Sequence, residues 1–125
     1  ACAAGLATLD VIAGEGLVAH ARELGAYALD RLREMAGRHP LIGEVRGLGL
    51  LLGVELLRDH QTNARAVAEA EQVMYSALSR GPSFKVTMGN ILTLTPALVI
   101  SREEMDLALT ALDGALTEVE SGRAR

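Results

Sequence analysis

Apolar residues recur every three or four positions in the first part of the chain, which is the spacing of helices that bury one face. The chain opens in an alanine-rich run that already has this pattern and that ends at Gly14 and Gly16. A second helix is expected from Leu17 to Gly37, and Pro40 prevents its continuation. Because the sequence lacks an initiator methionine and begins inside a helical pattern, we expect it to be a piece of a longer chain.

The same helical spacing returns twice in the second half of the chain. It predicts a helix over Ala64–Arg80, for which Asn63 supplies a side-chain cap. It also predicts a closing helix after Ser101, because Ser101 and Glu104 have the spacing of a capping box. Ser121–Arg125 is expected to be a polar tail. The pattern thus predicts four helices.

Between these helices the apolar residues change to an alternating period, which indicates strands. Two strands are expected, over Ile42–Gly47 and Gly49–Leu57, with a tight bend between them that glycine permits. Both faces of the second strand are largely apolar, so we expect it to be central in a sheet and covered on both sides. The segment Phe84–Ile100 is expected to be extended, with a turn at Gly89–Asn90 and with one face formed by Ile91, Thr93 and Thr95.

Short consecutive strands mixed with helices predict an α+β fold, in which helices cover a small, mostly antiparallel sheet. A length of 125 residues corresponds to one domain, 1–125, with one hydrophobic core. Half of the residues are apolar, which excludes a disordered chain. A net charge of −4 and only three aromatic residues argue against nucleic acid as a partner. A negative chain repels the phosphates, and few aromatic side chains are available to stack on bases.

The sequence also bears on the expected compartment. It contains no apolar run of the roughly 18 residues that a membrane span needs, and no signal peptide is visible. Cys2 is the single cysteine, so an internal disulfide is excluded. These features fit a reducing compartment, and we expect a cytoplasmic location without membrane contact.

No complete active site is visible among the residue types that usually carry chemistry. His20, His39 and His60 do not have the spacing of zinc ligands, so each is expected to be a surface histidine and no metal site is expected. Cys2 lies in the alanine-rich run and is expected to be a small buried residue rather than a nucleophile. Lys85 is the single lysine.

Several segments in collinear order resemble the class III pyridoxal-phosphate-dependent aminotransferases. Residues 45–56, VRGLGLLLGVEL, are similar to a hairpin of that family, and residues 1–12, ACAAGLATLDVI, are similar to the helix after its Gly-Asn-Pro segment. Residues 85–100, KVTMGNILTLTPALVI, resemble its last strand and the Pro-Pro-Leu exit, and residues 101–105 resemble the start of its closing helix. The resemblance covers essentially the whole sequence, although no single motif is diagnostic.

The resemblance implies that the chain is the small C-terminal domain of a fold type I enzyme, without the large cofactor-binding domain. The family's Schiff-base lysine would then lie upstream of Ala1, so no catalytic residue is expected in this sequence. Bound pyridoxal 5'-phosphate is expected in the full-length parent and not on this fragment alone. Lys85 precedes a strand and has no aspartate nearby for a pyridine nitrogen, which disfavours it as the Schiff-base lysine.

The resemblance also points to two substrate-binding candidates, Thr93 and Lys85. In many class III enzymes the last strand carries an arginine that grips a substrate carboxylate, and Thr93 stands at that position here. Either the substrate lacks a carboxylate there, or another group such as Lys85 holds the anion. A third alternative is that Thr93 is an ordinary strand residue without a role in substrate binding. Arg46 is expected to form a salt bridge to the larger domain, and Glu55 to pair with a basic group.

The predicted activity of the parent is transfer of an amino group from an amine or amino acid to a keto acid. One alternative is an ammonia-lyase or phospho-lyase of the same family, which the threonine at position 93 favours. Another is a free-standing α+β binding or regulatory module. The expected partners are the missing large domain, a second copy in a homodimer, and the small-molecule amine and keto acid.

Overall fold

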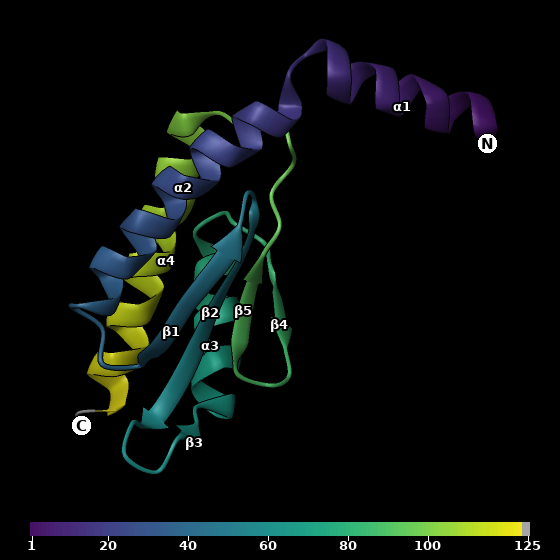
Figure 1. The fold of residues 1–125 in the computed structure, drawn as a ribbon. Helices are drawn as coiled ribbons and strands as arrows, with labels where there is room; N and C mark the ends of the chain where they lie inside the picture. Colours follow the sequence, from purple (N-terminus) through teal and green to yellow (C-terminus); the bar gives the residue numbers. More distant parts are fainter. Residues whose placement is uncertain (124–125) are drawn as a thin grey trace.

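The computed structural model describes residues 1–123, which form four helices and five strands in one α+β unit (Figure 1). The elements follow in the order α1 Cys2–Gly14, α2 Leu17–Ala36, β1 Ile42–Leu48, β2 Leu51–Asp59, β3 Ala64–Arg65, α3 Val67–Ser79, β4 Lys85–Thr87, β5 Ile91–Leu94 and α4 Arg102–Arg123. The predicted fold class, a small antiparallel sheet covered by helices, is therefore confirmed.

Four strands form the sheet in the order β1-β2-β5-β4, and every pairing is antiparallel. The two-residue strand β3 adds to the far end of β2. The β4–β5 hairpin turns at Met88 and Gly89, which both have positive φ, and the expected turn at Gly89–Asn90 thus lies one residue earlier. The position of β2 between β1 and β5 confirms that it is a central strand.

One face of the sheet carries the hydrophobic core and is covered by α2, α3 and α4 (Figure 1). Alternate residues of β2 on this face are buried: Leu52, Val54 and Leu56. The other face has no covering helix, and Leu51 at its start is 59% exposed. The expectation that β2 is covered on both sides is therefore wrong for these residues, because its second apolar face is open in the fold.

A pair of glycines brings α2 against the β1–β2 hairpin. A Cβ at Gly25 would lie 2.0 Å from the carbonyl oxygen of Gly49, so no larger residue fits there unless the hairpin moves. Gly49 itself has a φ of +55°, in the left-handed region that glycine tolerates best. Two small residues, one on each element, thus let the helix backbone touch the turn.

Helix starts were predicted with mixed success. At α4, the amide of Glu104 donates to Ser101 Oγ at 3.1 Å and the amide of Ser101 donates to Glu104 Oε2 at 2.8 Å, which confirms the capping box. At α3 the prediction is wrong, because the helix begins at Val67 and no side chain caps it. Asn63 instead has a φ of 55° in the turn before β3. The pairing of β3 with β2 delays the start of this helix.

The ends of the chain also differ from the expected picture. Helix α4 continues to Arg123, so residues 121–123 of the expected polar tail are helical, and residues 124–125 lie outside the described residues. Helix α1 projects away from the fold and buries none of its residues (Figure 1). Cys2 is exposed, which corrects its prediction as a buried residue.

Within residues 1–123 no single helix is long and apolar enough to cross a membrane, although α1 and α2, bent by 63°, pass that test as a pair.

Candidate functional site in the open face of the sheet

The open face of the sheet carries one row of residues that crosses all four strands. Strand pairing aligns Arg46 of β1 with Gly53 of β2, Gly53 with Thr93 of β5, and Thr93 with Lys85 of β4. Cross-strand partners point to the same face of a sheet, so these residues form a row with a cation at each end. Gly53 has no side chain, which leaves the middle of the row open beside Thr93.

Both substrate-binding candidates from the sequence lie in this row. Lys85 is exposed on β4, an edge strand of the sheet, and stands directly opposite Thr93. The Thr93 hydroxyl is half-buried and lies 2.7 Å from the hydroxyl of Thr87 on the neighbouring strand. The structure thus brings the Lys85 ammonium group and the hydroxyls of Thr87 and Thr93 to one side of the open face. These groups could donate hydrogen bonds to an anionic or other acceptor group of a ligand.

Arg46, at the other end of the row, is held by carboxylates of this same chain. Its Nη1 donates to Glu44 Oε2 at 2.7 Å and to Glu55 Oε2 at 2.9 Å. The hydrogen bond from Arg46, helped by others from nearby groups, lowers the pKa of the Glu55 carboxyl below its ordinary value. Glu55 as the partner of a basic group is confirmed, whereas the salt bridge from Arg46 to a larger domain stays a prediction.

A buried amide, which the sequence interpretation assigned only to a turn, supports the centre of the open face. Asn90 is 1% exposed; its side-chain amide donates to the carbonyl of Leu56 at 2.9 Å and reaches Glu55 Oε1 at 3.4 Å. Its side-chain oxygen accepts from Arg65 Nε at 2.9 Å. An asparagine directly after a glycine in an expected turn was the available signal, because such residues often bond to nearby backbone.

The histidines divide into two groups. His60 is exposed and its Nε2 lies 2.7 Å from the carbonyl of Pro40, while His20 Nε2 lies 2.8 Å from the carbonyl of Ile100. His39 is only 5% exposed, so its prediction as a surface residue is wrong. It sits between two carboxylates of α4, Asp113 and Glu120. Among residues 1–123 no group of histidine, cysteine and carboxylate side chains is arranged to hold a metal ion.

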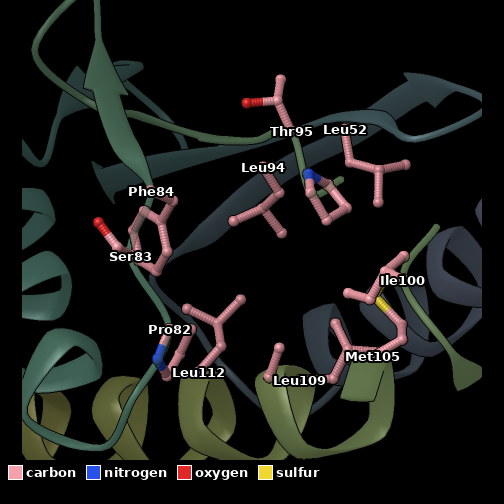
Figure 2. Close-up of a pocket in the computed structure, with 12 residues that line it drawn as sticks. Leu52, Pro82, Ser83, Phe84, Leu94, Thr95, Ile100, Met105, Leu109 and Leu112 are labelled. Atoms are coloured by element: carbon pink, nitrogen blue, oxygen red, sulfur yellow. The ribbon is translucent and has the colours of Figure 1, made fainter. Parts of the chain in front are cut away.

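A second hollow lies on the covered side of the sheet, between β5 and α4 (Figure 2). It has a volume of about 240 Å³ and is lined mainly by apolar side chains, among them Leu52, Phe84, Leu94, Met105 and Leu109. Figure 2 shows the hydroxyls of its two polar lining residues, Ser83 and Thr95, directed away from the space. Because this hollow presents no group that could catalyse a reaction, the open face is the better candidate site.

Comparison with known proteins decides the family. The aminotransferase class III family matches residues 1–116, which is most of the sequence. The chain belongs to the class III aminotransferase family. This assignment confirms the resemblance of the hairpin, the last strand and the closing helix, and members of the family depend on pyridoxal phosphate.

Class III relatives of the chain catalyse more than one kind of reaction. The (R)-1-hydroxy-2-aminoethylphosphonate ammonia-lyase of Vibrio splendidus is 46% identical over 118 residues, which are 94% of this chain and 25% of that protein. The isoleucine 2-epimerase of Lentilactobacillus buchneri is 49% identical over 120 residues, which are 96% of this chain and 27% of that protein. The chain therefore spans about a quarter of the length of these relatives.

Solved class III structures share the fold closely. An amine transaminase from an uncultivated Pseudomonas species, in its pyridoxal-phosphate-bound internal aldimine form, superposes with a TM-score of 0.87 at 32% identity. The match covers 94% of this chain and 27% of that one. The chain thus has the fold of part of a class III structure, while the greater part of the neighbouring structure has no counterpart in it.

The residues of this chain do not by themselves fit pyridoxal phosphate. A Schiff-base lysine needs surroundings that hold the cofactor ring and its phosphate. Lys85 is exposed on an edge strand, and its direct cross-strand neighbour is the hydroxyl-bearing Thr93. The negative groups of the open face, Glu44 and Glu55, already pair with Arg46 at the opposite end of the row. No step of a reaction is therefore assigned to the cofactor within this chain.

Proposed function

We propose that the chain is the small C-terminal domain of a pyridoxal-phosphate-dependent class III enzyme that transfers an amino group from an amine or amino acid to a keto acid. The observation that carries this proposal is the open sheet face, on which Thr93 and Lys85 stand side by side without a covering element. In this proposal the catalytic lysine and the cofactor-binding residues belong to a large domain that precedes Ala1.

The role proposed for the open face is recognition of the substrate rather than bond making. Thr93 replaces the arginine that grips a carboxylate in many class III enzymes, and its hydroxyl offers a hydrogen bond without a charge. Lys85, directly opposite, supplies one positive charge to an anionic substrate group. Thr93 and Lys85 together suit a substrate that places, beside them, a group other than the carboxylate of a simple ω-amino acid.

The large domain is also the proposed partner of the apolar surface at one end of the fold. Exposed apolar side chains gather on α1, on the start of α2, on the tip of the β1–β2 hairpin and on the segment after β5: Leu6, Leu9, Val11, Val18, Leu48, Leu51, Leu98 and Val99. A helix without any buried residue and without a polar face, such as α1, normally lies inside a larger structure. We propose that the parent is a homodimer, as the family resemblance implies.

A second candidate is elimination of ammonia on the same cofactor. Two observations favour it: the threonine at position 93, and the 46% identity to a phosphonate ammonia-lyase. The two activities differ in their need for an acceptor, because amino transfer requires a keto acid and elimination does not. Ammonia release from an amino-phosphonate without any keto acid would support the lyase.

The deciding experiment uses the reading frame upstream of Ala1. We expect it to continue into a lysine-bearing domain, and we expect the full-length enzyme to convert a keto acid to an amino acid when an amine donor is present. Borohydride reduction with pyridoxal phosphate, followed by mass mapping, should place the pyridoxyl group on an upstream lysine. A start codon directly before Ala1, or a stoichiometric adduct on Lys85 of the 125-residue chain, would contradict the proposal and favour a free-standing module.

A further inference from the structure

His39 lies at the corner between α2 and β1 and connects that corner to the last helix. Its Nδ1 is 2.8 Å from Glu120 Oε2 and its Nε2 is 2.9 Å from Asp113 Oδ1, so each ring nitrogen faces a carboxylate. Both acceptors come from α4, on turns seven residues apart. His39 is 5% exposed, and the Glu120 side chain is 17% exposed, whereas Asp113 is 38% exposed at the edge of the site.

The two distances determine which form of the ring suits the site. A neutral imidazole carries one N–H and one lone pair, so it can donate to only one of the two carboxylates. Its lone pair would then face the other carboxylate at hydrogen-bond distance, which is repulsive in a buried site. The imidazolium form has two N–H groups and satisfies both oxygens. The geometry therefore selects the doubly protonated ring.

We propose that His39 is a pH-sensitive clamp, which in its doubly protonated form fastens the α2–β1 corner to α4 and which releases one of its two carboxylates when the ring loses a proton. The clamp has a backbone component as well. Glu120 also accepts the amide of Leu41 through Oε1 at 3.0 Å, so the carboxylate that holds the ring also holds the chain at the start of β1. No part of this proposal depends on the reaction of the parent enzyme.

Charged groups from several elements surround the clamp. Arg38, on the same corner, donates to Asp113 Oδ1 at 2.6 Å and fixes that carboxylate beside the ring. Around Glu120 the surface is lined from the β2 end, the following turn and α4 by Arg58, Asp59, His60 and Arg123. His60 bonds to the Pro40 carbonyl rather than to Glu120, and Arg58 is engaged with Glu69 of α3.

The balance of these effects predicts the direction of the pH response. Burial of the ring, the largest single influence, lowers the pKa of His39, but the hydrogen bonds and charges of Glu120 and Asp113 together outweigh it and raise the pKa above its ordinary value of 6.5. A raised folded-state pKa contributes stability that is fully present below the unfolded value. That contribution is lost as the pH rises through the folded-state pKa, so the clamp opens on the alkaline side.

The test needs no substitution in its first part. The ¹⁵N resonances of the His39 ring in the 125-residue chain report protonation of each nitrogen, and they are followed from about pH 5 to about pH 9. We expect both nitrogens to carry protons at pH values where an ordinary histidine is already neutral. Loss of protection of the Leu41 amide against hydrogen exchange across the same titration, beyond the intrinsic pH dependence of exchange, would identify Glu120 as the released carboxylate. A single neutral tautomer at about pH 6.5 would overturn the proposal.

Two variants on α4 separate the clamp from a general charge effect. Glu120→Gln keeps an oxygen acceptor for Leu41 but removes the charge beside the ring, so it should shift the His39 titration to lower pH. Glu118→Gln is the matched control, because Glu118 lies on the same helix but contacts Ser76 and Arg80. Equal titrations of His39 in both variants would contradict the clamp.

The free energy of unfolding in urea gives an independent readout. The difference between the wild type and His39→Gln should be largest at acidic pH and should shrink as the pH rises through the wild-type titration. A difference that stays constant over the whole range would mean that His39 only fills space. If His39→Gln does not fold, the ring resonances of the wild type and of Glu120→Gln still decide.

Discussion

The two faces of the sheet are made by the same strands but have opposite properties. On the covered face, Leu52, Val54, Leu56 and Leu92 are at most 1% exposed and belong to the hydrophobic core. On the open face, the alternate positions of the same strands carry Arg46, Glu55, Thr93 and Lys85, or no side chain at Gly53. One face stabilises the domain and the other leaves polar groups available. Alternate residues of one strand thus separate the stabilising core from exposed polar groups.

The two faces of the sheet also differ in the contacts that their side chains make within this chain. The covered face needs no partner beyond this chain, because α2, α3 and α4 bury it. On the open face, Arg46 bridges Glu44 and Glu55, and the hydroxyls of Thr87 and Thr93 bond to each other. Leu51 on this face is 59% exposed, whereas Leu57 and Ile91 are partly buried. The open face is therefore the side on which a further domain or a substrate finds unsatisfied surface.

The largest expected effect comes from removing a side chain of the covered face. Leu92→Ala should cost about 2–5 kcal/mol of unfolding free energy, because it leaves a cavity in a fully buried site. The matched change on the open face, Leu51→Ala, should cost less than about 1 kcal/mol, since Leu51 already contacts solvent. Urea denaturation of both variants measures the difference. Equal losses would mean that the open face is covered in solution, for instance by a second copy.

The second effect concerns recognition on the open face and uses the full-length enzyme proposed above. The wild type should use simple ω-amino acids such as 4-aminobutyrate poorly, because Thr93 cannot form a charge-assisted bidentate pair. Thr93→Arg should raise kcat/KM for 4-aminobutyrate by about tenfold to a thousandfold, since hydrogen bonds to charged groups contribute about 1.5–3 kcal/mol each. An uncharged amine serves as the control substrate. If the wild type prefers the carboxylate substrate and the ratio does not change, Thr93 is not at the substrate.

The smallest effect tests whether the ion pairs of the open face matter for stability. Arg46→Met should cost no more than about 1 kcal/mol, because exposed ion pairs are screened by water. It should also raise the pKa of Glu55, whose carboxyl is now kept ionised mainly by Arg46. Because the pKa of Glu55 is lowered in the folded state, the ion pair contributes stability at pH values above the ordinary pKa of a glutamate. That contribution is lost as the pH falls through the folded-state pKa. A double-mutant cycle with Glu55→Gln measures the coupling, and a coupling of several kcal/mol would contradict this view.

Local patterns predicted most of the elements of this fold but not their surroundings. The capping box at Ser101 and the helical spacing after it act within one turn of chain, so the start of α4 could be read directly. The interpretation of Asn63 as a cap failed because β3 pairs with β2, a contact across the loop that no local signal reveals. The second apolar face of β2 led to the wrong expectation of cover on both sides, because the alternation of apolar residues does not reveal which face the helices pack on.

Candidate site residues were predicted with similar limits. Thr93 and Lys85 were selected from the family resemblance, and strand pairing places them opposite each other, although their role in substrate binding stays a prediction. The His39 site was missed, because its two carboxylates lie 74 and 81 positions away in the sequence. Only the folded arrangement of α4 against the α2–β1 corner brings the three groups together.

That long separation also has a consequence for how the chain reaches its fold. Contacts between α2 or its corner and the last part of the chain recur at separations near 80 residues, as in His20 with Ile100, Tyr27 with Asp106 and His39 with Glu120. Contacts so far apart slow folding, because a long loop must close before they form. At a synthesis rate of about 5–20 residues per second, roughly 4–16 s separate the appearance of the two partners on the ribosome. During that time the apolar stripe of α2 has no α4 to cover it, and the nascent chain presents the kind of surface that chaperones bind.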